Sequence, residues 1–490
     1  MKLRELLTDI KPLACTAELE TEILDIRYDS RHVKAGELFV AIVGLETDGH
    51  QYIPMACLNG AAVVVCEVKP ELDIPYVLVE DSRQALSYIS ARYFGQPAKG
   101  MTMLGVTGTN GKTTSTLLIK SVLEHCLDAK IGLIGTNENM IDDMVIPTER
   151  TTPESYVLQK LLRQMADAGC THVVMEVSSH ALALGRVAGI RYAVGVFTNL
   201  SQDHLDFHET MEQYAMAKAA LFAQSDVGII NMDDDYTPFM LEVAQASSCK
   251  VCGFSVDKNE ADLMAKNIRL KPGSVAFSVL IPGEIQRMEL HIPGQFSVYN
   301  ALGVVGTVNA LGVPLSEIAE ALAKADGVKG RVEPVPTDGD YTILIDYAHT
   351  PDALENVLAA VRRFATGRVV ALFGCGGDRD RTKRPVMGEV AVRLSDFVIV
   401  TSDNPRTEVA GEIIKDILAG MKKTKTPYVA MEDRREAIGY AIAHHQPGDV
   451  IVLAGKGHET YQEIGKVKHH MDEREIVAEY LAARRTEVPQ

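Results

Sequence analysis

The stretch GVTGTNGKTTST, Gly105 to Thr116, has most features of a phosphate-binding loop. The strict pattern places a glycine five positions before the Gly111 of Gly-Lys-Thr. Val106 occupies that position, and the earlier glycines stand at 105 and 108. An apolar segment typical of a buried strand, MTMLGVTG, leads into the loop, and a segment with helical spacing begins at Lys112. Backbone N–H groups of such a loop and the N-terminus of the helix point at one spot, which favours an anion there.

The residue types after the glycines indicate which anion. We expect Lys112 to reach the β- and γ-phosphates of ATP and Thr113 to hold Mg²⁺. The expected ATP-binding residues of the loop are Gly108, Thr109, Asn110, Gly111, Lys112, Thr113 and Thr114. The alternative is a glycine-rich turn without a ligand, which would leave the Lys-Thr-Thr run without a function.

Strand and helix patterns divide the 490 residues into three blocks, because the chain is too long for one hydrophobic core. Block 1–98 has short apolar strands and a helical stretch from Ser82 to Phe94, followed by the linker FGQPAKG. Block 99–330 alternates strands with helices, then changes between about Val251 and Leu290 to short strands typical of a small antiparallel subsheet. Block 331–490 again alternates strands with helices. We predict a three-domain α/β protein with a P-loop-type central domain and a Rossmann-like C-terminal domain.

The composition argues against several classes of protein. The net charge is −17, so we expect no basic face for general nucleic-acid binding. No apolar run approaches the roughly 18 residues of a membrane-spanning helix, and the N-terminus lacks the apolar core of a signal peptide. We interpret the eight cysteines as reduced thiols without a metal or redox role, and we predict a cytoplasmic protein.

Three polar residues of the central block stand out by their position. Glu176 ends the apolar run THVVME, and a carboxylate at the carboxyl end of a strand beside a phosphate loop suits Mg²⁺. His204, in QDHLDFH, is either an ordinary loop histidine or a site residue. Lys218 lies among small and apolar residues of the helical stretch MEQYAMAKAALF, where the simplest interpretation is a lysine that reaches solvent.

Seven segments occur in the order shown by one known family: GTNGKTT, MEVSSHAL, TNLSQDHLDFH, AKAALF, FSVYNALG, VKGRVE and DYAHTPDAL. The chain resembles the Mur ligase and folylpolyglutamate synthetase superfamily over essentially all of its residues. The resemblance implies an ATP-dependent ligase. ATP phosphorylates a carboxylate, an amine attacks the acyl phosphate, and the products are an amide, ADP and phosphate. Such a reaction holds two anions together, so its site needs cations.

The resemblance also implies roles for individual residues. The expected catalytic residues are Lys112, Glu176, His204 and Lys218. The expected Mg²⁺ ligands are Thr113, Glu176, His204 and Lys218, the last carbamylated to N6-carboxylysine so that it holds a second Mg²⁺ as an anion. Burial would favour the neutral amine that takes up CO₂. Asn300, Arg331 and Asp346 complete the expected ATP site, with Arg331 across from the γ-phosphate.

Segments outside the central block resemble one branch of the family. DSRHVKAGELFVAIVG resembles its UDP-binding domain. GCGGDRDRTKRPVMG and SDNPRTE resemble the branch that joins meso-2,6-diaminopimelate to UDP-N-acetylmuramoyl-L-alanyl-D-glutamate, in the peptidoglycan synthesis on which cell shape and cell division depend.

The expected substrate contacts follow from this branch. They are Tyr28 and Ser30 at the uridine diphosphate end, and Thr151, Thr152, Ser178 and Arg186 at the muramoyl-dipeptide. Arg150 and Leu184 depart from the family pattern, so no contact is assigned to them. The expected diaminopimelate contacts are Arg379, Asp403, Asn404, Pro405, Arg406, Gly455 and Glu459.

Three alternative functions remain open. The same ligase could add L-lysine, although Arg406 and Arg379 suit a distal carboxylate that lysine lacks. In a different class, a P-loop NTPase would couple hydrolysis to conformational change and would need no UDP-binding domain. A protein that only binds ATP is the weakest option. Because ATP and the amino acid are expected on different blocks, we predict that the blocks approach about a hinge near Gly327 to Val332.

Overall fold

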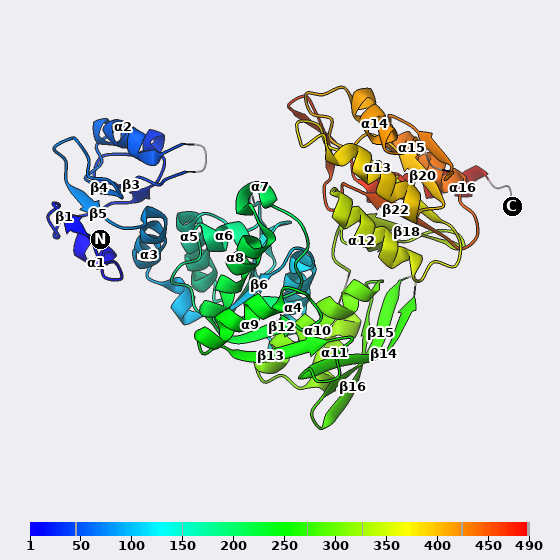
Figure 1. The fold of residues 1–490 in the computed structure, drawn as a ribbon, viewed down its shortest axis with the longest axis horizontal. Coiled ribbons are helices and arrows are strands. Elements are labelled where there is room, and N and C mark those ends of the chain that lie inside the picture. The colour runs from blue at the N-terminus through cyan, green and yellow to red at the C-terminus, as the bar shows by residue number, and fades with distance from the viewer. Residues whose placement is uncertain (45–46, 149, 272, 326, 423–424, 488–490) are drawn as a thin grey trace. The chain divides into compact units, whose positions relative to one another are not determined.

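The structure is a computed structural model that describes residues 1–44, 47–148, 150–271, 273–325, 327–422 and 425–487 (Figure 1). The chain divides between Gly253 and Phe254 into two units, and each unit is described by itself.

The N-terminal part of the first unit is a small sheet with the strand order β1-β5-β4-β3-β2. The strands are β1 (Ala14–Cys15), β2 (Ile26–Arg27), β3 (Leu38–Val40), β4 (Val63–Cys66) and β5 (Tyr76–Leu78). β2 to β5 are parallel, and β1 pairs antiparallel with β5. The helices are α1 (Leu3–Leu6), η1 (Ser30–His32), η2 (Gly49–Tyr52), α2 (Ile53–Leu58) and α3 (Ser82–Tyr93). Every residue of β4 is buried, as a parallel strand covered on both faces requires.

The second sheet of this unit has the order β13-β12-β11-β6-β10-β7-β8-β9. The strands are β6 (Thr102–Thr107), β7 (Ile131–Ile134), β8 (Asn139–Ile141), β9 (Met144–Ile146), β10 (His172–Glu176), β11 (Tyr192–Phe197), β12 (Ser225–Asn231) and β13 (Lys250–Ser255). β6, β7, β10, β11 and β12 are parallel, and β7 to β9 form an antiparallel edge. The helices are η3 (Pro97–Gly100), α4 (Lys112–Leu127), α5 (Ser155–Asp167), α6 (Ser179–Ala183), α7 (Leu205–His208), α8 (Met211–Ala223) and α9 (Thr237–Ala246).

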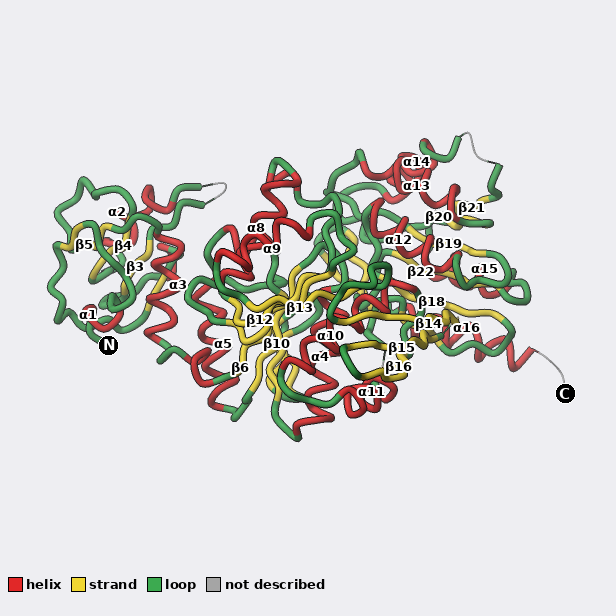
Figure 2. Tube along the Cα trace, turned by 60° about the horizontal axis from the view of Figure 1, so that its bottom comes forward, coloured by secondary structure: helices red, strands yellow, loops and turns green. Residues whose placement is uncertain are grey.

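Helices cover both faces of the parallel strands (Figure 2). Met103 of β6 and Val173 of β10 belong to a core cluster with Leu158 of α5 and Leu221 of α8. α4 contacts β6, β7 and β10 but supplies no residue to that cluster, so it lies on the opposite face. The chain continues from β6 to β7 on one side of the sheet and later returns to β11 on the other. β6 is therefore a topological switch point, where the carboxyl ends of parallel strands leave a crevice for a ligand.

The second unit begins with an antiparallel subsheet of order β16-β15-β14, beside the last residues of β13. The strands are β14 (Leu263–Lys271), β15 (Ser274–Ile281) and β16 (Glu284–Leu290), and the helices are α10 (Gln295–Ala310) and α11 (Leu315–Lys324). α10 is buried along most of its length, which fits its run of small and apolar residues.

A six-stranded sheet of order β17-β18-β22-β19-β20-β21 follows, parallel except for β17. The strands are β17 (Glu333–Val335), β18 (Tyr341–Asp346), β19 (Val369–Phe373), β20 (Phe397–Val400), β21 (Tyr428–Ala430) and β22 (Asp449–Ala454). The helices are α12 (Pro351–Arg362), α13 (Lys383–Leu394), α14 (Ala410–Ala419), α15 (Arg434–Ala443) and α16 (Glu473–Glu487). α12, α13 and α14 pack on one face of the sheet, and α15 and α16 pack on the other.

The predicted three-domain α/β fold is confirmed, including the antiparallel subsheet and the helix that begins at Lys112. Three details of the sequence interpretation are wrong. The linker FGQPAKG contains η3, and the β8–β9 hairpin was not expected. The alternation of strands with helices expected in block 331–490 is interrupted after β22, where the hairpin β23 (Tyr461–Ile464) and β24 (Val467–His470) precedes the next helix.

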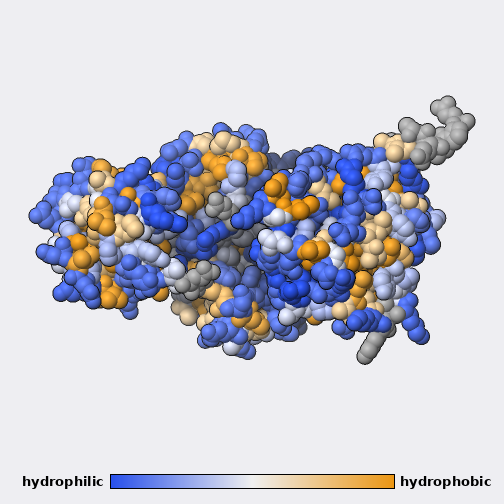
Figure 3. Space-filling model, turned by 90° about the horizontal axis from the view of Figure 1, so that it is seen from above, coloured by the Kyte–Doolittle hydropathy of each residue, from blue (hydrophilic) through white to orange (hydrophobic). Residues whose placement is uncertain are grey.

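The face shown in Figure 3 is mostly hydrophilic, with apolar residues in small separate groups. Among the described residues, no helix is long and apolar enough to cross a membrane. All eight cysteines are free thiols. Cys249 and Cys252 have the Cys-x-x-Cys spacing, which the sequence interpretation missed, but Cys249 is buried before β13 whereas Cys252 is half-buried within it.

Candidate active site

The glycine-rich loop connects β6 to α4 and needs two glycines for its shape. Gly108 has φ +150° and Gly111 has φ +85°, a region of backbone conformation that favours glycine. A Cβ atom at Gly108 would overlap the hydroxyl of Thr198 and lie 3.1 Å from the carbonyl oxygen of Asn199. Gly105 lies inside β6, where a Cβ would press on the ring of Tyr192 at 3.0 Å. The unusual glycine spacing therefore follows from close packing around this loop.

Two lysines converge on one carbonyl oxygen of the loop. Lys112 Nζ donates to the carbonyl oxygens of Gly108 at 2.9 Å and Thr109 at 3.0 Å. Lys218 Nζ donates to the same Gly108 oxygen at 2.8 Å. Two ammonium groups this close repel each other unless an anion compensates them or one of them loses its proton. Lys112, together with the N–H groups of the loop, therefore favours phosphate groups here.

Lys218 is buried in α8, with only 1% of its surface exposed. The interpretation of a lysine that reaches solvent is therefore wrong. Its Nζ lies 4.5 Å from the centroid of the Tyr214 ring. Burial, followed by the charge of Lys112, lowers the pKa of Lys218 well below its usual value. These surroundings favour the neutral amine, which is the form that reacts with CO₂.

Glu176 ends β10 next to β6 and is buried. Its Oε1 accepts from the Thr136 N–H at 2.8 Å and its Oε2 accepts from the Thr136 hydroxyl at 2.9 Å. Thr136 follows β7, a strand that the sequence interpretation overlooked, so this partner was missed. The carboxylate and the buried Thr113 hydroxyl are hard oxygen donors of the kind that Mg²⁺ prefers, and they fit such an ion.

His204 lies in the loop after β11 with φ +54°, an uncommon conformation for a residue other than glycine. Its ring is 4.8 Å from the ring of His180, which stacks on Phe207. Burial lowers the pKa of His204, and the charges of Lys112 and Lys218 act in the same direction, against that of Asp203. The lowered pKa favours the neutral ring at pH 7, which is the form that a metal ligand requires.

His180 and His208 join His204 in a histidine cluster that was not predicted. His208 Nε2 is 2.9 Å from the Ser179 hydroxyl, and its ring stacks on Tyr214. Burial lowers the pKa of His208 to about 4. The residue types alone gave no signal for this cluster, because His180 and His208 belong to separate helices.

The four residues predicted to bind the muramoyl-dipeptide lie together beside Glu176. They are Thr151, Thr152, Ser178 and Arg186. The Thr152 hydroxyl donates to the Glu176 carbonyl at 2.8 Å, and the Ser178 N–H donates to the Thr152 hydroxyl at 3.1 Å. Arg186 Nη1 donates to the Thr152 carbonyl at 3.3 Å.

Glu154 holds the nearby arginines. Arg186 Nε is 2.7 Å from Glu154 Oε1, and Arg150 Nη1 donates to the same oxygen at 3.0 Å. Burial lowers the pKa of Arg186, and Glu154 opposes this effect. Arg150 thus has a structural partner, while Leu184 ends the short helix α6.

Tyr28 and Ser30 follow β2 in the N-terminal sheet. Ser30 is buried in η1, and its carbonyl accepts from Asn59 Nδ2 at 2.9 Å. Tyr28 is half-buried and packs against the apolar core of this sheet. The two residues lie at the carboxyl end of a parallel strand, where a ligand is expected.

The remaining predicted ATP residues belong to the second unit. Asn300 is buried in α10. Asp346 ends β18 and accepts from the N–H groups of Val332 and Ala348, both at 2.8 Å. Burial raises the pKa of Asp346, against the charge of Arg331. The Arg331 guanidinium lies over the ring of Tyr347, 5.1 Å from its centroid.

The predicted amino-acid residues gather at one edge of the six-stranded sheet, because each follows the carboxyl end of a parallel strand. Arg379 follows β19, the Asp403–Arg406 segment follows β20, and Gly455 and Glu459 follow β22. Asn404 Nδ2 donates to Glu459 Oε2 at 2.9 Å. Gly455 has φ +115°, and a Cβ there would lie 2.5 Å from Asp403 Oδ2. The separate motifs of the C-terminal block thus form one group.

The two arginines of this group have different partners. Arg406 Nε donates to Glu463 Oε2 at 3.1 Å, and its Nη1 donates to the Gly377 carbonyl at 2.8 Å. Arg379 Nη1 donates to the Asp378 carbonyl at 3.3 Å and is otherwise exposed. Pro405 is buried directly before Arg406, which has φ +50°.

Three buried cations support this group, and the sequence interpretation missed all three. Arg384 of α13 pairs with Glu408 and Asp416, and Arg434 of α15 pairs with Glu473. Lys456, between Gly455 and Gly457, is fully buried. The sequence around each cation does not show that its side chain is buried, because most of its partners come from distant segments.

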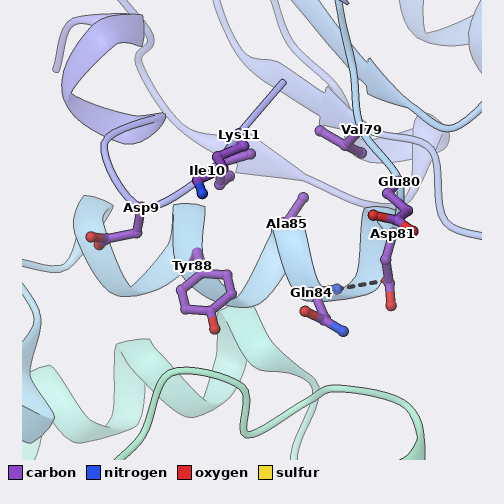
Figure 4. Close-up of a pocket in the computed structure, with 9 residues that line it drawn as sticks. All are labelled: Asp9, Ile10, Lys11, Val79, Glu80, Asp81, Gln84, Ala85 and Tyr88. Carbon is purple, nitrogen blue, oxygen red and sulfur yellow. Dashed lines mark hydrogen bonds between the residues drawn. The ribbon is translucent and has the colours of Figure 1, made fainter. Parts of the chain in front are cut away.

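A cavity of about 530 Å³ in the N-terminal part of the first unit is lined by none of the predicted site residues (Figure 4). Its wall includes Asp9, Lys11 and one face of α3, whose first turn is capped by Asp81. Among the described residues, one acidic trio has metal-ligand spacing: Glu124, Asp142 and Asp143. Neither feature contains a predicted site residue, so neither defines the active site.

The fold and the first-unit site define a class of protein. A glycine-rich loop and a helix N-terminus at the switch point of a parallel sheet, with cations and a buried carboxylate around them, are features of P-loop-type nucleotide-binding α/β proteins. Three family models match the chain: the Mur ligase family catalytic domain at residues 22–94, the Mur ligase middle domain at 106–308, and the Mur ligase glutamate ligase domain at 330–457. The chain belongs to the Mur ligase family.

The sequence of this chain aligns with individual relatives over almost the whole length of each relative. A protein of Caldanaerobacter subterraneus subsp. tengcongensis, named UDP-N-acetylmuramoyl-L-alanyl-D-glutamate--2,6-diaminopimelate ligase, is 48% identical, covering 98% of this chain and 99% of that protein. The protein of the same name from Clostridium botulinum is 46% identical, covering 95% and 96%. A solved structure of a protein with this name is 32% identical, with a TM-score of 0.74 and 99% of each chain covered.

Proposed function

We propose that this chain is an ATP-dependent ligase that adds meso-2,6-diaminopimelate to UDP-N-acetylmuramoyl-L-alanyl-D-glutamate in peptidoglycan precursor synthesis. The observation that carries the proposal is full-length identity of 41–48% to proteins named for this substrate and this amino acid. The cluster of charged side chains at the edge of the C-terminal sheet supports it, because an amino acid with two charged ends needs such partners.

The proposed reaction has two steps. A carboxylate of the D-glutamate residue takes the γ-phosphoryl group of ATP, and ADP leaves. The neutral amine of diaminopimelate then attacks the carbonyl carbon, the C–N bond forms, and phosphate leaves. The first step brings two anions together and the second releases phosphate, so the cations Lys112 and Arg331 would stabilise the negative charge in both.

Mg²⁺ belongs to this proposal as the ion that neutralises the phosphates. Thr113, Glu176 and His204 would hold Mg²⁺, and a carbamylated Lys218 would hold a second Mg²⁺. Two observations support the carbamate: Lys218 is buried, and its surroundings favour the neutral amine. Thr136 would orient the Glu176 carboxylate by its two hydrogen bonds.

The substrate contacts are proposed as the sequence predicts them. Tyr28 and Ser30 would bind the uridine diphosphate end. Thr151, Thr152, Ser178 and Arg186 would bind the muramoyl-dipeptide, and their grouping beside Glu176 supports this. Arg379, Asp403, Asn404, Pro405, Arg406, Gly455 and Glu459 would bind diaminopimelate.

The domain limits also remain proposals: 1–98 for the UDP-substrate domain, 99–330 for the ATP domain and 331–490 for the amino-acid domain. The ranges of the three family models support them. A cytoplasmic location, and a role in cell division and the cell cycle, belong to the same proposal.

Release of ADP tests the class of enzyme. The ligase should release ADP over many turnovers only when the UDP-substrate and diaminopimelate are both present, because the acyl phosphate is consumed only by the amine. With the UDP-substrate alone, it should release at most about one ADP per enzyme molecule. The control is the Lys112→Ala variant under the same conditions. Rapid ADP release with ATP alone would contradict the proposal and favour an NTPase that couples hydrolysis to conformational change.

A further inference from the structure

Lys456 is a fully buried lysine between two glycines, directly after the strand β22. Burying an ammonium group is costly unless it is paired and hydrogen-bonded. Its Nζ donates to Asn404 Oδ1 and to Glu459 Oε2, both at 2.9 Å. Both partners belong to the group proposed to bind the amino acid, so the buried charge acts on that group.

Lys456 fixes the orientation of the Asn404 amide. An ammonium and a backbone N–H can only donate, and Asn404 Oδ1 faces both Lys456 Nζ and the N–H of Glu463, each at 2.9 Å. The amide nitrogen must therefore point the other way, where it donates to Glu459 Oε2. Without the lysine, one of the two donors that hold this orientation is lost.

The same contacts determine which carboxylate oxygens of Glu459 and Asp403 can still accept a hydrogen bond from a ligand. Glu459 Oε2 accepts two hydrogen bonds, from Asn404 and from Lys456. Asp403 Oδ1 accepts from the Asn404 N–H at 2.7 Å, whereas Asp403 Oδ2 is buried without a partner among the described residues. Asp403 is 7% exposed, so this oxygen is a buried acceptor beside the Lys456–Asn404–Glu459 contacts.

Asp403 Oδ2 leaves one acceptor position in this group for a further cationic donor. Asp403 and Glu459 carry two negative charges, and Lys456 supplies one positive charge. Arg406 and Arg434 already face carboxylates of their own, Glu463 and Glu473. Burial alone would raise the pKa of Asp403, but Lys456, Arg434 and the Asn404 N–H hold it below its usual value. The carboxylate therefore stays ionised and can accept from an ammonium group.

We infer that Lys456 is a positioning residue that prepares Asp403 and Glu459 to bind a primary ammonium group at the distal end of the incoming amino acid. The inference rests on the proposed function, because it names how that amino-acid site recognises its ligand. Lys456 touches Asn404 and Glu459 and acts through them.

The test compares amine donors that differ in this ammonium group. Purified full-length wild type and Lys456→Met are assayed with meso-diaminopimelate and with 2-aminopimelate, which keeps the distal carboxylate but lacks the distal ammonium. The methionine keeps most of the side-chain volume and removes the charge. Lys468→Met is the matched control, because Lys468 also lies over the Tyr461 ring but is exposed.

In Lys456→Met the KM for diaminopimelate should rise about 10- to 100-fold, the effect of losing one charge-assisted hydrogen bond. The KM for ATP should stay within about twofold, since the change lies in the amino-acid group. The wild type's preference for diaminopimelate over 2-aminopimelate should fall by about the same 10-fold or more. Lys468→Met should leave the KM for diaminopimelate and the preference between the two amines unchanged.

Three results would overturn the inference. The first is an unchanged preference between the two amines in a folded Lys456→Met protein. The second is a uniform loss of kcat with every KM unchanged. The third is failure of both Lys456→Met and Lys456→Gln to fold, which would assign the lysine to stability alone.

The activity of the wild type with each amino acid tests the proposed function separately from the role of Lys456. If the wild type ligates lysine instead of diaminopimelate, the proposed amino acid is wrong. The preference for lysine over norleucine, which lacks the distal ammonium, then tests Lys456 in the same way.

Discussion

Gly108→Ala tests whether the loop after β6 is built to bind phosphate. Gly108 has φ +150°, and a methyl group there would overlap the Thr198 hydroxyl. That hydroxyl donates to the Asn110 carbonyl at 2.6 Å, and the Gly108 carbonyl accepts from Lys112 and Lys218. The substitution should therefore displace the loop and both lysines together.

The structure gives the size of the expected effect. A non-glycine residue in this conformation costs about 1–3 kcal/mol. Loss of the Thr198 hydrogen bond adds about 1 kcal/mol. Because ATP binding would require the native shape of the loop, about 2–4 kcal/mol should appear in binding, a roughly 30- to 1,000-fold rise in the Kd for ATP.

Titration calorimetry with ATP and Mg²⁺ measures this change. The matched control is Gly169→Ala, where φ is also positive, +85°, but no atom lies within 4 Å of the added methyl group. That variant should lose about 1 kcal/mol of unfolding free energy and bind ATP normally. Wild-type affinity for ATP in Gly108→Ala would refute the assignment of the loop.

Four further predictions concern individual parts of the site. Lys112→Ala should fold normally and lose about 10³-fold or more in turnover, because a cationic clamp on phosphate is removed; near-normal steady-state rates would exclude this role. Lys218→Ala should be almost inactive and partly rescued by short carboxylic acids that replace the carbamate. Electron density that ends at an unmodified ammonium in a nucleotide-bound crystal at neutral pH would argue against the carbamate. Arg406→Lys should raise the KM for diaminopimelate far more than the KM for ATP, because a point charge replaces a planar fork; equal changes in both would contradict this. Closure of the domains should change small-angle scattering when an ATP analogue and both substrates are added, and an identical curve would count against a hinge near Gly327 to Val332.

Much of the fold could be predicted from the sequence, since strands and helices alternate with clear apolar runs. The strand before the loop and the helix from Lys112 to Leu127 follow directly from hydrophobic pattern and glycine placement. The β8–β9 hairpin could not be predicted, because MVI at 144–146 is mostly exposed and carries no apolar alternation. Short edge strands depend on pairing with a neighbour rather than on their own residues.

Some residues of the candidate site could also be predicted from the sequence, and others could not. Lys112 and Glu176 could be predicted from position alone, one after a glycine-rich loop and the other at a strand end. Lys218 could not, because a helix sequence does not tell whether a lysine points to solvent or to a distant carbonyl group. Lys456 was missed for a similar reason, since its partner Asn404 lies 52 residues away along the chain.

Hydrogen bonds within the second unit restrict where a hinge between Gly327 and Val332 can lie. Gly330 to Val332 are tied to the C-terminal domain: the Tyr347 N–H donates to the Gly330 carbonyl at 3.0 Å, and the Val332 N–H donates to Asp346 at 2.8 Å. At Gly327 an added Cβ would lie 3.8 Å from its nearest neighbour among the described residues, the carbonyl oxygen of His291, so the backbone there is less crowded than at Gly330. Any hinge should therefore lie towards Gly327.

The choice of amino acid tests the account most directly. Wild-type protein is incubated with ATP, Mg²⁺, UDP-N-acetylmuramoyl-L-alanyl-D-glutamate and equal concentrations of meso-diaminopimelate and L-lysine, and the products are identified by mass spectrometry. A site built around a distal carboxylate and ammonium can reject an analogue that lacks one of them by about 10⁴-fold. The account predicts a product that contains diaminopimelate and almost none that contains lysine. Equal amounts of the two products, or no ligated product at all, would contradict it.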